Sequence, residues 1–166
     1  AQASKKTANK LFITEVNWPL IGMKNWAPAE DYLINESQQS SYLVRYYLLM
    51  LATGKVKKCF WHQLVAPGYG LVNNLDEKIK KRDAYYCFQN LIAMLSGGTT
   101  KKMIREKNLF CLVVEKEETL IEAIWSSEGS ANFKSNSKQK IFDIRGKVID
   151  TKKSPIINIS GEVIYV

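Results

Sequence analysis

Two candidate strands, each followed by a segment of helical periodicity, constrain the fold of this chain more than any other feature. Residues 11–16 (LFITEV) and 56–65 (VKKCFWHQLV) are the predicted strands. The first is continuously apolar around a β-branched centre, which is typical of a parallel strand covered on both faces. The order strand, helix, strand, helix predicts a parallel sheet with right-handed crossovers. Two strands alone make a poor sheet, so we expect further strands to pair with their open edges.

Both predicted helices have clear limits. The first begins at Glu36 and is ended by Gly54, and the second is closed by Gly97 and Gly98. A broad apolar face, suited to packing on a sheet, runs along each of them. In the first helix it consists of two adjacent stripes, Tyr42, Tyr46 and Leu49 beside Leu43, Tyr47 and Met50; in the second helix it consists of Ala84, Phe88, Leu91 and Leu95.

The pattern changes at about residue 99, from helical periods to short strand-like runs. These runs are LFCLVV, TLIEAIW, KQKIFDI and EVIYV, separated by turns rich in Glu, Ser, Gly and Asn. Mixed apolar and polar residues favour half-buried antiparallel strands. We therefore predict an α/β unit over residues 1–98 and a small antiparallel β-sandwich domain over residues 99–166.

The net charge and the cysteine content narrow the classes of function that the chain can have. The formal net charge is +8, which makes a basic nucleic-acid-binding protein one alternative. The lysines form no stripe along one helix, and no zinc-finger spacing occurs. The three cysteines, Cys59, Cys87 and Cys111, lie in apolar segments without a CxxC pair, so we expect free thiols and no metal or cofactor. No apolar run is long enough to cross a bilayer, and the compartment is open between a bacterial cytoplasm and a periplasm or cell envelope.

Candidate functional residues stand at the ends of the two predicted parallel strands. Glu15 ends the first strand, and Trp61, His62 and Gln63 end the second. In α/β barrels the reacting groups lie at that end of the strands. A tryptophan ring beside hydrogen-bonding side chains is a typical site for a pyranose, because the C–H face of the sugar stacks on the ring and its hydroxyls form hydrogen bonds. The structural alternatives are a Glu15 paired with an arginine of another strand and a Trp61 that caps the core.

The segment Thr14-Glu15-Val16-Asn17-Trp18-Pro19 resembles the strand-seven nucleophile motif of clan-A retaining glycoside hydrolases. These (β/α)8-barrel enzymes include β-xylosidases, α-L-iduronidases and related bacterial polysaccharide hydrolases. The later segments keep the order of that family. They are residues 37–43 for helix seven, 60–72 for strand eight and its loop, 82–85 for helix eight (with Arg-Asp in place of Lys-Pro), and the D-x-x-G turn of residues 141–146 in a C-terminal β-domain.

The resemblance implies the last two β/α units of a TIM barrel followed by a β-domain, and a glycosidase that forms a covalent glycosyl-enzyme on Glu15. The acid/base carboxylate belongs to strand four of the family, so the chain alone is expected to be inactive. Asn35-Glu36 does not supply it, because we expect Asn35 to cap the following helix. The implied partners are a carbohydrate and the remaining N-terminal barrel portion, or self-association. The implied substrate-binding residues are Asn17, Trp18, Trp61, His62 and Gln63.

Three other functions compete with this one. A non-catalytic carbohydrate-binding or scaffolding module would use exposed aromatic residues of the C-terminal part, for which Trp125, Phe133 and Tyr165 are the candidates. A nucleic-acid-binding protein would lose affinity steeply with salt. A degenerate barrel would keep Glu15 without activity.

Overall fold

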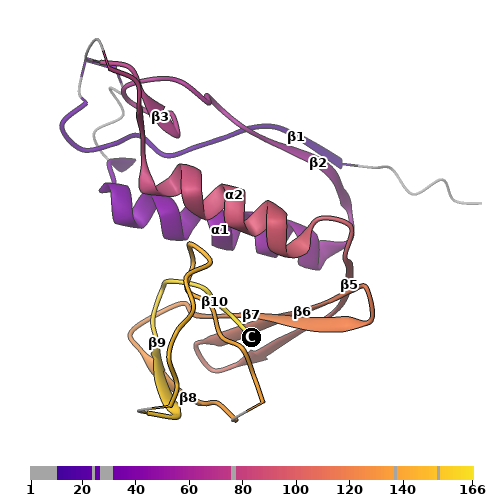
Figure 1. Cartoon of the computed structure of the whole chain (residues 1–166). Helices are drawn as coiled ribbons and strands as arrows, with labels where there is room; N and C mark the ends of the chain where they lie inside the picture. The colour runs from indigo at the N-terminus through magenta and orange to yellow at the C-terminus, as the bar shows by residue number, and fades with distance from the viewer. Residues whose placement is uncertain (1–10, 24, 27–31, 76–77, 137, 153) are drawn as a thin grey trace, which may run out of the picture.

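The computed structural model describes residues 11–23, 25–26, 32–75, 78–136, 138–152 and 154–166. In chain order the elements are β1 (Leu11–Val16), α1 (Glu36–Thr53), β2 (Val56–Trp61), β3 (Val72–Asn73), β4 (Lys80–Lys81), α2 (Asp83–Leu95), β5 (Thr99–Glu106), β6 (Leu109–Lys116), β7 (Thr119–Ser126), β8 (Ala131–Lys134), β9 (Ile156–Ile159) and β10 (Ile164–Tyr165). Figure 1 shows three tiers, with the two helices between the β1–β2 pair and the C-terminal sheet.

The predicted parallel pairing of the first two strands is confirmed, because β1 pairs with β2 in parallel. Their sheet has two strands, and no sheet closes into a barrel within the described ranges. The expected cover on both faces is wrong for this chain. Leu11 and Phe12 are 54% and 47% exposed, and Phe60 of β2 is 50% exposed. The helices cover one face of the pair, and the described residues leave large apolar side chains of the strands in solvent.

The first helix begins and ends as the sequence predicts, and α2 ends at Leu95, just before the predicted stop at Gly97 and Gly98. Asn35 is the N-cap of α1, and its side chain accepts a hydrogen bond from the backbone N–H of Gln38, whose own side chain reaches back to the N–H of Asn35. This reciprocal arrangement is a capping box. Gly54 ends the helix in the left-handed conformation, with φ of 61°. A β-carbon would be strained there, so glycine is the residue that stops the helix.

The C-terminal part is built on a four-stranded sheet in the order β10-β7-β6-β5, with β8 and β9 as a separate antiparallel pair. Neighbouring strands of the larger sheet run antiparallel. The expected strand at KQKIFDI is wrong. Phe142 makes isolated bridges only, and Asp143 then starts a tight turn in which its Oδ1 accepts the backbone N–H groups of Arg145 and Lys147. Gly146 completes that turn with φ of 85°.

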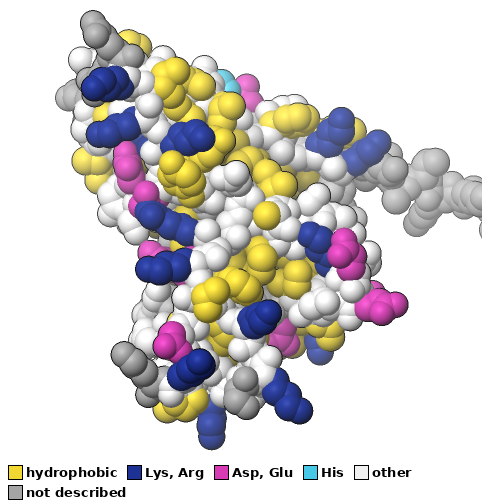
Figure 2. All heavy atoms as spheres, in the orientation of Figure 1, with side chains coloured by type: hydrophobic (Ala, Val, Ile, Leu, Met, Phe, Trp, Pro, Cys, Tyr) yellow, Lys and Arg dark blue, Asp and Glu magenta, His cyan; other side chains and the backbone are white. Residues whose placement is uncertain are grey.

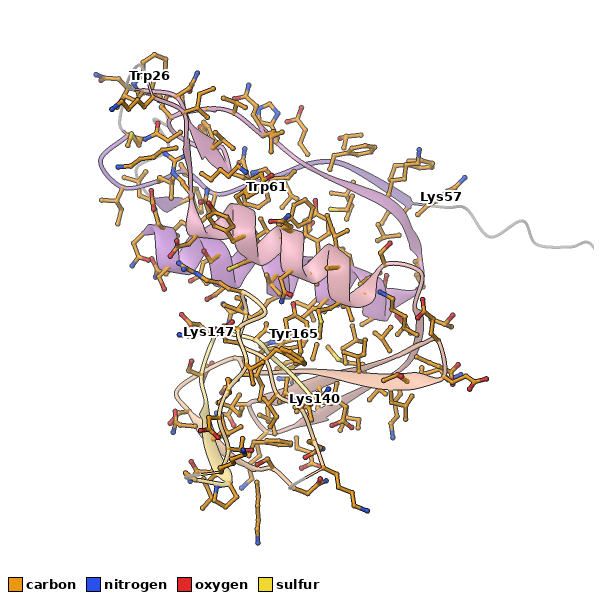
Figure 3. The ribbon with its side chains drawn as sticks, in the orientation of Figure 1. Trp26, Lys57, Trp61, Lys140, Lys147 and Tyr165 are labelled. Atoms are coloured by element: carbon orange, nitrogen blue, oxygen red, sulfur yellow. The ribbon has the colours of Figure 1, made fainter. Side chains whose placement is uncertain are left out.

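One hydrophobic core joins the helices to the C-terminal sheet. Leu43 and Leu48 of α1 belong to the same buried cluster as Leu112 of β6, Trp125 of β7 and Tyr165 of β10. Figure 3 shows Tyr165 between the helices and the sheet. Each of these five side chains is at most 2% exposed. The division into residues 1–98 and 99–166 stays a prediction, because the two parts share this core.

The cysteines and the charged side chains can be compared with what the sequence predicts. The three cysteines are free thiols, as the sequence predicts. Of the three, Cys87 is buried as expected, whereas Cys59 and Cys111 are only partly buried. Figure 2 shows lysine and arginine side chains spread over the visible face of the molecule and not gathered on one element. Neither described helix is long and apolar enough to span a membrane.

Candidate functional site

The carboxyl ends of β1 and β2 meet at an open hollow of about 530 Å³. Its lining is mainly polar and consists of Glu15, Val16, Asn17, His62 and Tyr69. Three of the residues that the sequence singled out, Glu15, Asn17 and His62, are therefore brought together. In parallel sheets this end of the strands is where ligands bind.

A bulge in β1 presents Glu15 to the hollow. Ile13 is opposite Cys59 and Val16 is opposite Trp61, so β1 spans this step with one residue more than β2. Such an extra residue bends a strand and re-aims the side chain beside it. Glu15 is exposed, and its carboxylate therefore carries no burial cost in the described chain. The exposure of Glu15 differs from the expectation that both faces of this strand are covered.

Two hydrogen bonds join the strands beyond their last paired residues. The backbone N–H of His62 donates to the carbonyl oxygen of Val16 at 3.1 Å. The side-chain amide of Asn17 donates to the carbonyl oxygen of His62. The following peptide bond, between His62 and Gln63, is cis. Asn17 thus fixes the end of β2 against the end of β1 and sets where Glu15 and His62 lie relative to each other.

The two tryptophans of the predicted site face away from the hollow. The Trp18 ring lies 5.6 Å from the ring of Tyr42, 5.8 Å from that of Tyr46 and 6.0 Å from that of Trp61. Figure 3 shows Trp61 between the strands and the helices. Because successive side chains of a strand point to opposite faces, Trp61 packs towards α1 while His62 faces the hollow. Gln63 is exposed and does not line the hollow.

A second, mostly apolar hollow of about 260 Å³ lies on the other side of this aromatic group. It is bounded by Trp18, Tyr46 and Arg45 of the α/β part and by Phe110 and Trp125 of the C-terminal sheet. The guanidinium of Arg45 stacks over Tyr42 at 5.0 Å from the ring centroid, and burial lowers the pKa of Arg45. Among the described residues, the lining of this second hollow contains no carboxylate.

Tyr69 is the lining residue that sequence reasoning missed. It lies in the segment Ala66-Pro67-Gly68-Tyr69-Gly70, which the sequence marks only as the end of a strand. The proline and the two glycines signal a break in structure, but they give no information about where the tyrosine between them points.

The described residues show no metal site and no thiol chemistry at the hollow. No three His, Cys, Asp or Glu side chains among them gather as metal ligands. Cys59 lies two residues before the end of β2 and does not line the hollow. Burial raises the pKa of its thiol, which makes it a poor nucleophile at neutral pH.

No family model and no curated protein matches this chain. Among solved structures it is similar to a family 39 glycoside hydrolase from the gut symbiont Bacteroides cellulosilyticus WH2. The TM-score is 0.74 at 16% sequence identity, and the match covers 99% of this chain and 34% of the hydrolase. The chain thus spans about a third of the length of that enzyme and shares the fold of that portion.

Proposed function

We propose that this chain is the C-terminal portion of a retaining glycosidase, with Glu15 as its nucleophile. The carboxylate of Glu15 attacks the anomeric carbon while an acid on the opposite side protonates the departing oxygen. A covalent glycosyl-enzyme forms, and water then releases the sugar while the second residue acts as base. The single observation that carries the proposal is the convergence of Glu15, Asn17 and His62 at the carboxyl ends of two parallel strands.

The fold likeness supports the same proposal. A family 39 glycoside hydrolase shares the fold of nearly the whole chain, and the motif around Glu15 resembles the nucleophile strand of that class of enzyme. On this basis β1 and β2 with their helices are the last two units of a (β/α)8 barrel, and residues 99–166 are an accessory β-domain. The substrate is a poly- or oligosaccharide.

The other predicted site residues take different roles in this proposal. His62 contacts sugar hydroxyls from the floor of the hollow, and Asn17 holds the two strand ends together. Trp18 and Trp61 back the site from the helix side, so their contribution is mainly to its rigidity. Gln63, which is exposed beyond the strand, is free to reach a sugar bound at the rim.

A second carboxylate is required, because one group cannot both protonate the leaving oxygen and attack. Retaining enzymes hold the two carboxyl groups about 5–5.5 Å apart. Glu15 is the one carboxylate among the described residues that line the hollow. We therefore propose that further barrel strands, which pair with the open edges of β1 and β2, supply the acid/base and complete the site.

The test is turnover by the complete gene product that contains this chain. Wild type, Glu15→Gln and the control Glu106→Gln, an exposed residue of β5, are assayed with a panel of aryl glycosides, and mass spectrometry detects a trapped glycosyl-enzyme. Glu15→Gln should lose several orders of magnitude in kcat without unfolding, and Glu106→Gln should lose none. Intact turnover by Glu15→Gln would make Glu15 a structural carboxylate.

The competing functions find little support. Of the aromatic residues that a binding module would need to expose, Trp125 is 2% and Tyr165 is 0% exposed. Phe133 is partly buried against the core of the C-terminal part. On the face that Figure 2 shows, the basic side chains are dispersed, whereas a nucleic-acid-binding surface gathers them along one face or groove.

A further inference from the structure

Residues 66–70, in the loop after β2, are held by hydrogen bonds to their carbonyl groups. In the segment from Ala66 to Gly70, all five carbonyl oxygens accept a hydrogen bond. Arg82 donates to those of Ala66 (3.2 Å), Pro67 (2.6 Å) and Gly70 (2.8 Å), the backbone N–H of Leu20 donates to Gly68 (3.0 Å), and Gln39 Nε2 donates to Tyr69 (3.2 Å). Residues 66–68 and 70 are buried, so their carbonyls need partners within the protein, and these bonds fix the conformation of the loop.

The side chains that hold the loop are themselves buried. Arg82 is 3% exposed and Gln39 is 0% exposed. Arg82 is the N-cap residue of α2, but its side chain makes no capping hydrogen bond. Its Nε donates instead to Glu36 of α1 at 2.9 Å. The loop is therefore fastened to the first turn of α1 and to the start of α2 at once.

Gly70 allows the tight closure of the loop. Its backbone N–H donates to the carbonyl of Ala66 at 3.1 Å. A β-carbon at Gly70 would lie 2.7 Å from that same carbonyl oxygen and 2.9 Å from the carbonyl oxygen of Val72. Both atoms belong to the backbone, which cannot move aside as a side chain can, so only glycine fits.

Tyr69 is the one residue of this loop that is not buried, and it lines the hollow that contains Glu15. We propose that Tyr69 is a substrate-contacting residue that determines sugar specificity, and that Gln39 and Arg82 are positioning residues that act through it. The inference rests on the proposed function and deepens it. A loop fixed by buried side chains that exposes a single aromatic residue to a polar hollow is suited to present that residue in one orientation.

The chemistry of a phenol ring fits this role. Its flat apolar face packs against the C–H face of a pyranose, and its hydroxyl both donates to and accepts from sugar hydroxyls. Because the loop is already ordered, binding of a sugar does not have to pay for ordering it. The ligand class is a neutral pyranose whose hydroxyls lie within reach of Tyr69 and His62.

Kinetics of the complete gene product test the contact. With the best-cleaved aryl glycoside, Tyr69→Ala should raise KM about tenfold or more, and Tyr69→Phe, which removes the hydrogen bonds of the hydroxyl to the sugar, should raise it several-fold. The ranking of aryl glycosides by kcat/KM should change in both variants. Tyr32→Ala, a change at a tyrosine that is 70% exposed and lies outside the hollow, is the control and should behave as wild type.

A nearly isosteric change tests the positioning claim without unfolding the loop. Gln39→Met removes the donor to the Tyr69 carbonyl and also the buried Gln39 Oε1, which has no hydrogen-bond partner in the described structure. We expect the amide of Gly70 to exchange its hydrogen about tenfold faster and KM to rise in the same direction as in Tyr69→Ala, with kcat little changed. Ser41→Ala, at a buried site on the same helix, should alter neither quantity.

Binding without turnover separates this inference from the proposed function. The affinity for the free monosaccharide product is measured by calorimetry in the Glu15→Gln background, with and without Tyr69→Ala. A loss of about tenfold supports the contact whether or not Glu15 proves to be the nucleophile. If Glu15→Gln abolishes turnover but Tyr69→Ala leaves KM, specificity and affinity within twofold, the inference is overturned while the nucleophile stands.

Discussion

Arg82 offers the sharpest test of how the site is built, because Arg82→Met keeps the apolar stem of the side chain and deletes all of its hydrogen bonds. Four bonds are lost, one to Glu36 and three to carbonyl oxygens of the loop. The carbonyl of Ala66 keeps its bond from the N–H of Gly70. Those of Pro67 and Gly70 are left without a partner.

The expected loss of stability follows from the two carbonyl groups that have no hydrogen-bond donor in the variant. Each unsatisfied buried acceptor costs about 1–3 kcal/mol, so Arg82→Met should lower the free energy of unfolding by about 4 kcal/mol. The freed carboxylate of Glu36 adds little, since its side chain is 57% exposed and water solvates it again. A loss of this size is a large fraction of the roughly 5–15 kcal/mol that stabilises an ordinary domain.

The assay is urea denaturation followed by tryptophan fluorescence, with Lys101→Met as the matched control. Lys101 forms an exposed ion pair with Glu115 at 2.7 Å, and such pairs contribute about 0–1 kcal/mol. With a slope of about 2 kcal/mol per molar urea, the Arg82→Met midpoint should fall by about 2 M. Equal midpoint shifts in the two variants would show that the bonds from Arg82 to the carbonyl groups do not hold the loop.

Two further predictions concern alkaline stability and association. Burial raises the pKa of the Cys87 thiol from 9.0 to about 11. The unfolded chain therefore loses this proton first, and the stability present below pH 9 falls as the pH rises to 11, by about 2 kcal/mol. In Cys87→Ala, the urea midpoint should depend less on pH between pH 9 and 11. An unchanged dependence would show that Cys87 is not the group responsible. In sedimentation, the 166-residue chain should associate through the open edges of β1 and β2. Phe12→Ser should reduce this association, and Ile79→Ser, at an exposed site elsewhere, should not. A monodisperse wild-type monomer would show that the open edges do not drive association.

The strands, helices and helix ends could be predicted because they depend on local patterns. Period and β-branching mark β1, and Asn35 and Gly54 mark the limits of α1 without help from distant residues. The KIFDI run shows where that approach fails. Its alternation is that of a strand, but Asp143 accepts two backbone N–H groups and bends the chain instead. A turn formed by a side chain competes with strand pairing and is not visible in the hydrophobic pattern.

The candidate site was predictable in its strand-borne residues and not in its loop. Glu15 and His62 follow from the position of strand ends in a parallel sheet. Tyr69 does not, because its placement depends on donors from Gln39 and Arg82, thirty and thirteen positions away in the sequence. Trp61 entered the prediction through its residue type, and only the alternation of the strand settles that it faces the helices.

The core that joins α1 to the C-terminal sheet has a consequence for protein engineering and for recombination between genes. Leu43 and Leu48 share one buried cluster with Leu112, Trp125 and Tyr165, so a chimeric crossover at residue 98 would divide this core between two parent proteins. Donor and recipient would each receive half of a packed interior. We therefore expect the C-terminal sheet and the helices to be exchanged together. A chimera joined before β1 should fold, whereas one joined between α2 and β5 should not.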